Sequence, residues 1–215
     1  MLQSSSSSSE AAATTDRGVS LHHGEEFQFR LVSTREELEQ CQRLRHAIFV
    51  QEQKAPREAE VDGKDHQAFH IVCYESAPPD TENASGESSS SSSPLVATGR
   101  VLIVPCTTSD GNGKDTAQAS SKDSPHQAIL GRIAVRQDHR GKGLGRRIVQ
   151  ELERIARSEG AVRASLTPHY YLERFYASLG YTKTPPPTDG SNGNNNDLIW
   201  INEHCQLIAM EKSLF

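Results

Sequence analysis

Hydrophobic and polar positions follow two different periods along the chain, and each period predicts a different element. Every second residue is apolar at Phe27, Phe29 and Leu31, which is typical of a half-buried strand. Apolar residues recur three or four positions apart over 38–48 and again over 144–155, the spacing of one helix face. The mixture of the two periods predicts an α/β fold.

Shorter patterns predict the remaining elements and their ends. Ser33 and Glu36 have the spacing of a capping box at the start of the first helix. Thr167 and Pro168 predict the N-cap and first residue of a last helix, and Gly180 predicts its end. Apolar runs predict strands at 68–74, 95–104 (interrupted at Thr98-Gly99-Arg100), 129–135, 162–166, 198–201 and 207–212.

Serine-rich and other polar segments separate these elements. Residues 1–25 have no hydrophobic period and are expected to form a disordered tail. Segments at about 77–94, 107–127 and 184–197 fall between elements, so we expect loop insertions there. Such loops cost little, about 0.6 kcal/mol per doubling of length. Residues 26–215 without these loops predict one domain.

Composition disfavours several classes of protein. A net charge of −5 argues against general nucleic-acid binding, and the four cysteines lack the spacing of a disulfide framework or a zinc site. No apolar run approaches the roughly 20 residues of a membrane span. The first residues lack the basic start and apolar stretch of a secretory signal. We therefore expect a cytoplasmic protein, with the nucleus left open, and no metal, membrane or nucleic-acid partner.

A glycine-rich turn at 140–145 (RGKGLG) joins the expected strand 129–135 to the following helix. Glycines let the backbone approach an anion, and a helix N-terminus adds partial positive charge. Arg146 stands where a dinucleotide fingerprint needs a third glycine, and the Gly-Lys-Ser/Thr of a P-loop is absent. The turn therefore predicts a phosphate site of another kind. The alternative is a strand–turn–helix connection that happens to use three glycines.

Three motifs resemble the GCN5-related N-acetyltransferases. Residues 140–145 resemble the R/Q-x-x-G-x-G/A loop of that family, and 175–181 (FYASLGY) resembles its F-Y-x-x-L-G-F/Y segment. Residues 45–53 (RHAIFVQEQ) and the following acidic segment resemble the ElaA/YjcF-like branch, whose substrates are largely undefined. The resemblance covers roughly 27–75, 95–104, 129–183 and 198–212.

This resemblance implies a single-domain acyl-CoA N-acyltransferase fold, with a mixed central β-sheet flanked by helices. It also implies an N-acetyltransferase that transfers an acetyl group from acetyl-CoA to a primary amine of a small molecule. In that family the amine attacks directly in a ternary complex. The implied coenzyme contacts are Ile133, Ala134, Val135, Arg140, Gly141, Lys142, Gly143, Leu144, Gly145 and Arg146.

The resemblance also suggests catalytic residues. Tyr176 is the expected general acid toward the coenzyme A sulfur, and the alternative is a core aromatic beside Phe175. Glu60 and Asp62, with neighbouring acids, are candidates for binding the substrate ammonium or accepting its proton. The alternative is a loop held by Arg45 and backbone N–H groups.

Several points stay open at this stage. Many relatives carry Asn or Gln near His169 and a His at Leu207, so the acceptor cannot be inherited from any of them. A non-catalytic coenzyme-A-binding module of the same fold is one alternative function. An acyltransferase similar to the acyl-homoserine-lactone synthases is another. The oligomeric state is left as monomer or homodimer.

Overall fold

The computed structural model describes residues 26–76, 93–106, 125–185 and 198–215. The expected tail at 1–25 lies outside the described residues, and so does most of each expected loop insertion.

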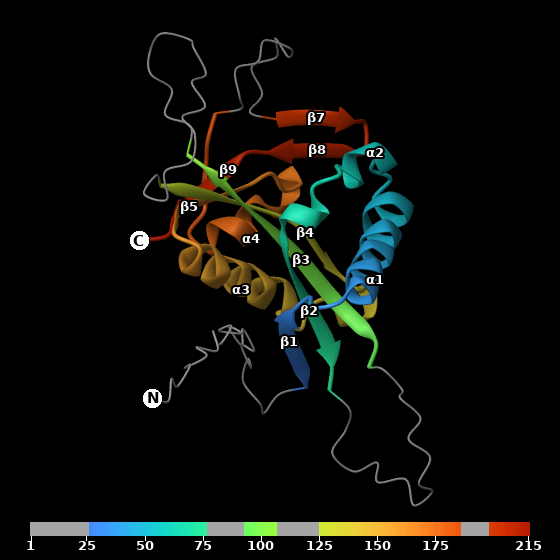
Figure 1. The fold of residues 1–215 in the computed structure, drawn as a ribbon. Helices are drawn as coiled ribbons and strands as arrows, with labels where there is room; N and C mark the ends of the chain where they lie inside the picture. The colour runs from blue at the N-terminus through green and yellow to red at the C-terminus, as the bar shows by residue number, and fades with distance from the viewer. Residues whose placement is uncertain (1–25, 77–92, 107–124, 186–197) are drawn as a thin grey trace, which may run out of the picture.

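A seven-stranded sheet forms the centre of the molecule, in the order β1-β2-β3-β4-β5-β9-β6 (Figure 1). Neighbouring strands are antiparallel except β4 and β5, so the sheet is mixed, as predicted. The strands are β1 (Phe27–Leu31), β2 (Phe69–Glu75), β3 (Leu95–Pro105), β4 (His126–Val135), β5 (Ala161–Leu166), β6 (Thr182–Lys183) and β9 (Met210–Ser213).

The C-terminal region differs from the expectation of two strands. β7 (Leu198–Asn202) and β8 (Cys205–Ile208) pair in a separate hairpin, and β9 joins the main sheet. The expected strand 207–212 is therefore wrong as one element. The N–H of Ile208 donates to the Pro168 carbonyl, and Leu207 bridges to His169, so β8 is bound to the segment after β5.

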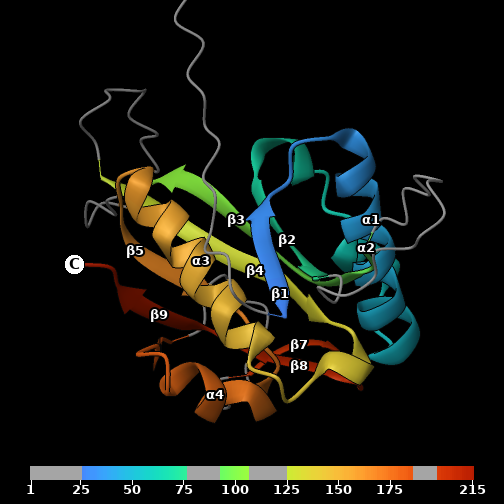
Figure 2. The same cartoon turned by 90° about the horizontal axis from the view of Figure 1, so that it is seen from below.

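Helices cover both faces of the sheet. Figure 2 shows α1 (Arg35–Arg45) and α3 (Leu144–Ser158) on opposite faces. α1 continues into a π-helical segment, η1 (His46–Glu52), where the N–H of Gln53 donates to the Ile48 carbonyl. The shorter helices are α2 (Arg57–Glu60), η2 (Asp65–Gln67), η3 (Gln137–His139), η4 (Tyr170–Leu172) and α4 (Glu173–Ala177).

Two expected helix starts are wrong. The capping box of α1 is formed by Thr34 and Glu37, one residue later than predicted, because the Thr34 hydroxyl accepts from the Glu37 N–H and the Glu37 carboxylate accepts in return. Thr167 is not an N-cap. β8 holds the next two residues extended, so helical turns begin only at Tyr170. The last helix, α4, has its C-cap at Ser178, two residues before the expected Gly180, which has φ +90° in the turn that follows.

α3 packs very close to β3 at Gly99. A Cβ on Gly99 would lie 2.4 Å from Cγ2 of Ile148 and 3.0 Å from Cδ1 of Leu152, which is too near for any side chain. The expected interruption of this strand is wrong, since β3 runs through Gly99 without a break. The irregularity is a bulge on β4, which has one extra residue there. Gly131 pairs with Arg100 and Ala134 pairs with Thr98.

The site is created where β4 and β5 part. β4 pairs with β5 only over 126–129, so the second half of β4 has one open edge. At the bulge Arg132 has φ +54°, a conformation that non-glycine residues adopt rarely and that often accompanies functional sites. The hairpin β7–β8 lies beyond this gap, above β4 in Figure 1.

Candidate active site

The glycine loop precedes α3 and presents backbone to solvent. Gly141 and Gly143 have φ of +82° and +79°, and a Cβ at either position would meet nothing within 4 Å. These glycines are therefore needed for the backbone conformation and not for lack of space. Gly143 is the N-cap of α3 without a capping side-chain hydrogen bond. The first N–H groups of a helix have no acceptor within it, so this turn is suited to an anion.

The basic side chains around the loop are already engaged. Arg140 binds both carboxylate oxygens of Glu52 at 2.7 Å each, and its Nε donates to the Val135 carbonyl at 3.1 Å. These hydrogen bonds lower the pKa of Glu52 and raise that of Arg140. Lys142 contacts Glu26 at 3.2 Å, and Arg146 donates to the Ser178 hydroxyl at 3.0 Å. The backbone is thus the part of the loop most directly open to a phosphate.

The open edge of β4 leads from this loop toward the interior. The N–H of Arg136 donates to the Val96 carbonyl of β3 at 2.9 Å. Because backbone groups alternate along a strand, the N–H of Ala134 also faces β3. Those of Ile133 and Val135 face the side that β5 has left. Of the three expected contact residues on β4, Ile133 and Val135 therefore offer backbone groups to a ligand, whereas the N–H of Ala134 faces β3.

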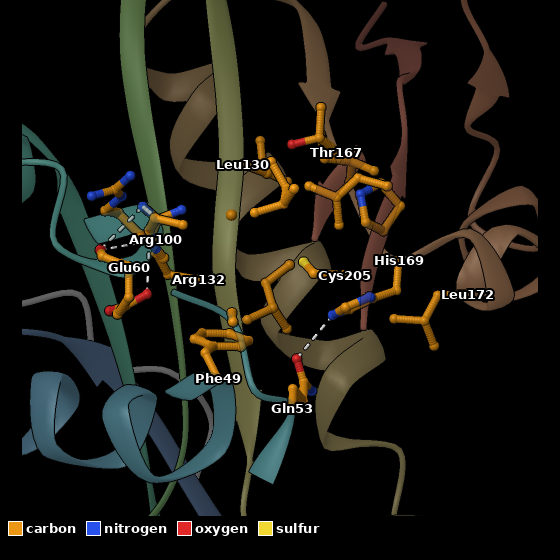
Figure 3. Close-up of a pocket in the computed structure, with 18 of the residues that line it drawn as sticks. Phe49, Gln53, Glu60, Arg100, Leu130, Arg132, Thr167, His169, Leu172 and Cys205 are labelled. Carbon is orange, nitrogen blue, oxygen red and sulfur yellow. Dashed lines mark hydrogen bonds and ion pairs between the residues drawn. The ribbon is translucent and has the colours of Figure 1, made fainter. Parts of the chain in front are cut away.

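A cavity of about 450 Å³ lies in the gap between β4 and β5, shown in Figure 3. None of residues 140–145 lines it, so the glycine loop and the cavity are separate parts of the site. Its walls are largely apolar, formed by Phe49, Ala55, Ala59, Ile129, Leu130, Ile133, Leu166, Pro168, Leu172, Ile201 and Leu207. Its polar residues are Gln53, Glu60, Arg100, Arg132, Thr167, His169, Tyr176 and Cys205.

Tyr176 lines this cavity from α4. Its ring is 6% exposed and makes edge contacts with Phe175 and Tyr181, at centroid distances of 4.9 and 6.0 Å. Burial raises the pKa of the Tyr176 phenol above its usual range, which keeps it protonated at neutral pH. The residue is therefore both a packed aromatic and a phenol at the cavity wall.

The expected acidic residues gather, but arginines surround them. The buried guanidinium of Arg45 binds Glu60 at 2.5 Å and Asp65 at 3.0 Å. Arg100 binds Asp62 at 2.6 Å and Asp65 at 2.8 Å. Arg132 reaches Glu60 at 3.0 Å and Asp62 at 3.1 Å. We call these six residues the charged network.

The arginines decide the ionisation of the network. Hydrogen bonds from arginines hold the pKa of Asp62 and Asp65 well below their usual range, against the opposing effect of burial. Burial raises the pKa of Glu60 in spite of its two arginines. Only Glu60 of these acids lines the cavity. The geometry favours the alternative of a loop tied down by Arg45, and the proposed proton transfer to Glu60 or Asp62 stays a prediction.

Sequence reasoning did not identify the arginines from β3 and β4. Arg100 and Arg132 stand in strands that are otherwise largely apolar, and a charge in such a run was the available signal. Within the described ranges, no group of three or more His, Cys, Asp or Glu side chains is arranged so that it could hold a metal ion.

His169 is the other residue whose role the sequence did not predict. It follows β5 and lines the cavity, and its Nε2 lies 3.0 Å from Oε1 of Gln53 (Figure 3). Its ring stacks on Tyr171 at 5.1 Å with an interplanar angle of 17°. Burial lowers the pKa of His169 below its usual 6.5. The departure from Asn or Gln in relatives was the signal for this position.

Comparisons with known proteins agree with this geometry. The sequence profile of the Acetyltransferase (GNAT) family matches residues 95–181. The uncharacterized N-acetyltransferase YjcF of Bacillus subtilis is 28% identical over 151 residues, covering 70% of this chain and 82% of that protein. Mouse N-alpha-acetyltransferase 80 is 42% identical over 64 residues, but the match covers 30% of this chain and 20% of that protein.

Solved structures share the fold. Escherichia coli ElaA has a TM-score of 0.54 and 20% identity, covering 87% of this chain and 99% of that one. A Lactobacillus plantarum structure described as an N-acetyltransferase has a TM-score of 0.57 and 21% identity, covering 89% and 100% of the two chains. At these identities the likeness concerns the fold.

The mixed sheet, the glycine loop and the opened strand pair define the acyl-CoA N-acyltransferase fold. The family match over residues 95–181 and the similarity to YjcF support the predicted GCN5-related N-acetyltransferase superfamily and its ElaA/YjcF-like branch. The protein is an acyltransferase, and the matched family uses an acyl-CoA as co-substrate. No helix among the described residues is long and apolar enough to cross a membrane.

Proposed function

We propose that this protein transfers an acetyl group from acetyl-CoA to a primary amine of a small molecule, by direct attack in a ternary complex. One observation carries the proposal. The open edge of β4 has a helix N-terminus with a glycine loop at one end and a cavity of about 450 Å³ beside its bulge. A donor and an acceptor can therefore approach the same strand from two directions.

The residues present fit a coenzyme A donor. The N–H groups of the glycine loop, residues 141–145, would hold the pyrophosphate, with Lys142 and Arg146 as further contacts. The backbone of Ile133 and Val135 would hold the pantetheine arm, since both N–H groups face the open edge. Bound there, the donor supplies an activated acyl carbon. One of these N–H groups would stabilise the oxyanion that forms when the amine attacks.

The cavity supports a small acceptor. A volume of about 450 Å³ falls within the range of small-molecule sites. Its walls are mostly apolar, so we propose a primary amine with an apolar body. Among the described residues, Glu60 is the one carboxylate on the wall, and we propose that it contributes to attracting the ammonium. Asp62, which does not line the cavity, pairs with Arg100 and Arg132, which do.

Tyr176 is the proposed general acid. Its phenol stays protonated on the cavity wall, and we propose that it hydrogen-bonds to the departing thiolate and gives it the proton. The ring contacts with Phe175 and Tyr181 would keep the phenol in one place during turnover. The ring packing and the proposed proton transfer therefore both depend on the position of Tyr176 at the cavity wall.

The test is release of free coenzyme A thiol from acetyl-CoA in the presence of single amines: polyamines, amino sugars, amino acids and arylalkylamines. We expect saturable thiol release with at least one amine, and an acetylated product of matching mass. A folded protein that binds acetyl-CoA but acetylates no amine would instead be a coenzyme-A-binding module. Turnover with long-chain acyl-CoA alone would favour the synthase-like alternative.

A further inference from the structure

We propose that His169 accepts the proton of the acceptor amine, and that Gln53 holds its imidazole in position. The inference rests on the proposed function and deepens it, because it assigns the base that the charged network does not supply. Figure 3 shows the two side chains reaching each other from different elements, His169 after β5 and Gln53 after η1.

The other ionisable groups of the cavity are unsuited to this role. Of the residues that the structure describes, six with ionisable side chains line it: Glu60, Arg100, Arg132, His169, Tyr176 and Cys205. Glu60 already accepts from Arg45 and Arg132, and the two cavity arginines are cations with no basic lone pair. Burial raises the pKa of both Tyr176 and Cys205, so each is a neutral acid at pH 7. His169 is the one neutral base among them.

Contacts hold the imidazole in place, and its tautomer follows from the assignment of the Gln53 amide. With Gln53 Oε1 as acceptor at 3.0 Å, Nε2 of His169 carries the hydrogen, and Nδ1 keeps the lone pair. The ring is stacked on Tyr171, and the His169 backbone is held by the bridge to Leu207 and by the N–H of Leu172. A base oriented on three sides is typical of a catalytic histidine.

The surroundings favour the neutral form. The ionisable groups near His169 are Tyr171 on its stacked face, Tyr170 beside that ring, and Cys205 on β8. The nearby carboxylate of Glu52 is paired with Arg140, so it does not stabilise an imidazolium. Burial alone lowers the pKa of His169. The imidazole therefore stays available as a proton acceptor at neutral pH.

The proton balance assigns one proton to each group. The ammonium first gives a proton to Nδ1 of His169, and the amine lone pair then forms the C–N bond with the acyl carbon. When the C–S bond breaks, the sulfur takes the electron pair and the Tyr176 proton. One of the two protons left on the nitrogen restores the Tyr176 phenol, the other stays as the amide N–H, and the imidazolium releases its proton to solvent. The net products are an amide, a thiol and one proton.

The test compares His169→Gln with the wild type. We expect kcat to fall about 100-fold or more, with an unchanged dissociation constant for acetyl-CoA. The wild-type kcat should fall on the acid side with an inflection below 6.5, and the variant should lack this inflection. His204→Gln, an exposed histidine next to β8, is the matched control and should behave as wild type. A His169→Gln enzyme that keeps the wild-type kcat and acid inflection would overturn the proposal.

Two further measurements separate a base from a structural residue. Imidazole added to His169→Gly should restore part of the lost rate, whereas a packing role would show no rescue. In nitrogen-15 NMR, the His169 signal is identified as the one that is absent from His169→Gln. In the wild type at pH 7, this signal should be that of a neutral imidazole protonated at Nε2. A charged ring, or a hydrogen on Nδ1, would contradict the proposal even if no amine turned over. If the ring is neutral and protonated at Nε2 but no amine turns over, the result counts against the proposed function instead.

Discussion

The donor side and the acceptor side of this site are built in different ways. The donor side is one contiguous stretch, the glycine loop and the start of α3, and its side chains form partly exposed pairs such as Arg140 with Glu52. The acceptor side takes residues from η1, α2, β3, β4, β8 and the segment after β5. It is supported by the charged network, in which Arg45 is almost fully buried.

The donor side binds mainly through backbone N–H groups, whereas the acceptor side is built from side chains. A phosphate can be held by N–H groups that a few glycines expose, so the donor side depends little on distant residues. The acceptor side depends on carboxylates and guanidiniums far apart in sequence, each of which would be costly to leave unpaired. Substitutions of similar chemistry should therefore have unequal effects on the two sides.

The largest effect is expected at Arg45. Arg45→Met should lower the free energy of unfolding by about 3–5 kcal/mol, because Glu60 and Asp65 lose a buried partner. Urea denaturation measures this change. Arg35→Met, on the same helix but with a side chain 92% exposed, should change it by less than about 0.5 kcal/mol. Equal effects of the two substitutions on the free energy of unfolding would contradict the distinction between the buried and the exposed ion pairs.

The next effect is expected at Tyr176. Tyr176→Phe should lower kcat about 100-fold while leaving acetyl-CoA affinity unchanged, since the phenol is needed for proton transfer and not for donor binding. Tyr181→Phe removes another buried hydroxyl, one that does not line the cavity, and should keep the wild-type kcat. Steady-state kinetics of both variants decide the point, and a Tyr176→Phe enzyme with full activity would exclude the acid role.

A smaller effect should appear in the acid stability. The lowered pKa values of Asp62 and Asp65 mean that the unfolded chain binds more protons, so stability is lost as pH falls below about 4. Glu60, with its raised pKa, opposes this trend. Asp62→Asn should therefore flatten the decline in unfolding free energy between pH 5 and 3. An unchanged slope would mean that the carboxylate is not ion-paired in solution.

The smallest effect is expected at Arg140. Arg140→Met should change the free energy of unfolding by less than about 1 kcal/mol, because its pair with Glu52 is partly exposed. Acetyl-CoA affinity should weaken by no more than about tenfold, or 1.4 kcal/mol, since backbone N–H groups provide most of the site. Titration calorimetry and urea denaturation measure both quantities. A much larger loss of affinity would give Arg140 a direct part in binding.

The same contrast explains how far the sequence could predict the structure. The glycine loop and the strand and helix around it follow from one short stretch, and they were predicted correctly because local periodicity and backbone preference determine them. The capping box was misplaced by one residue because Ser33 and Thr34 are both competent caps. The late start of helical turns at Tyr170 could not be predicted, because β8, nearly 40 residues further on, holds Pro168 and His169 extended.

The acceptor side was predicted in part. The acidic motif identified Glu60 and Asp62, but periodicity does not tell which distant cations will meet them. Arg100 and Arg132 reach the network only through the pairing of β3 with β4 and the bulge at Arg132. His169 gains its partner Gln53 from a segment 116 positions earlier in the chain. Contacts of this kind arise from tertiary structure, which local patterns do not encode.

The most direct test of the account is isothermal titration of acetyl-CoA into the purified protein, into an Arg140→Glu, Gly143→Asp double variant and into a matched control. The control is Arg35→Glu, Gly160→Asp, which changes the same residue types, including a glycine at φ +77°, away from the site. We predict saturable binding by the wild type and the control, and none by the loop variant. A folded wild type that does not bind, or a loop variant that binds equally well, would contradict the assignment of the donor site.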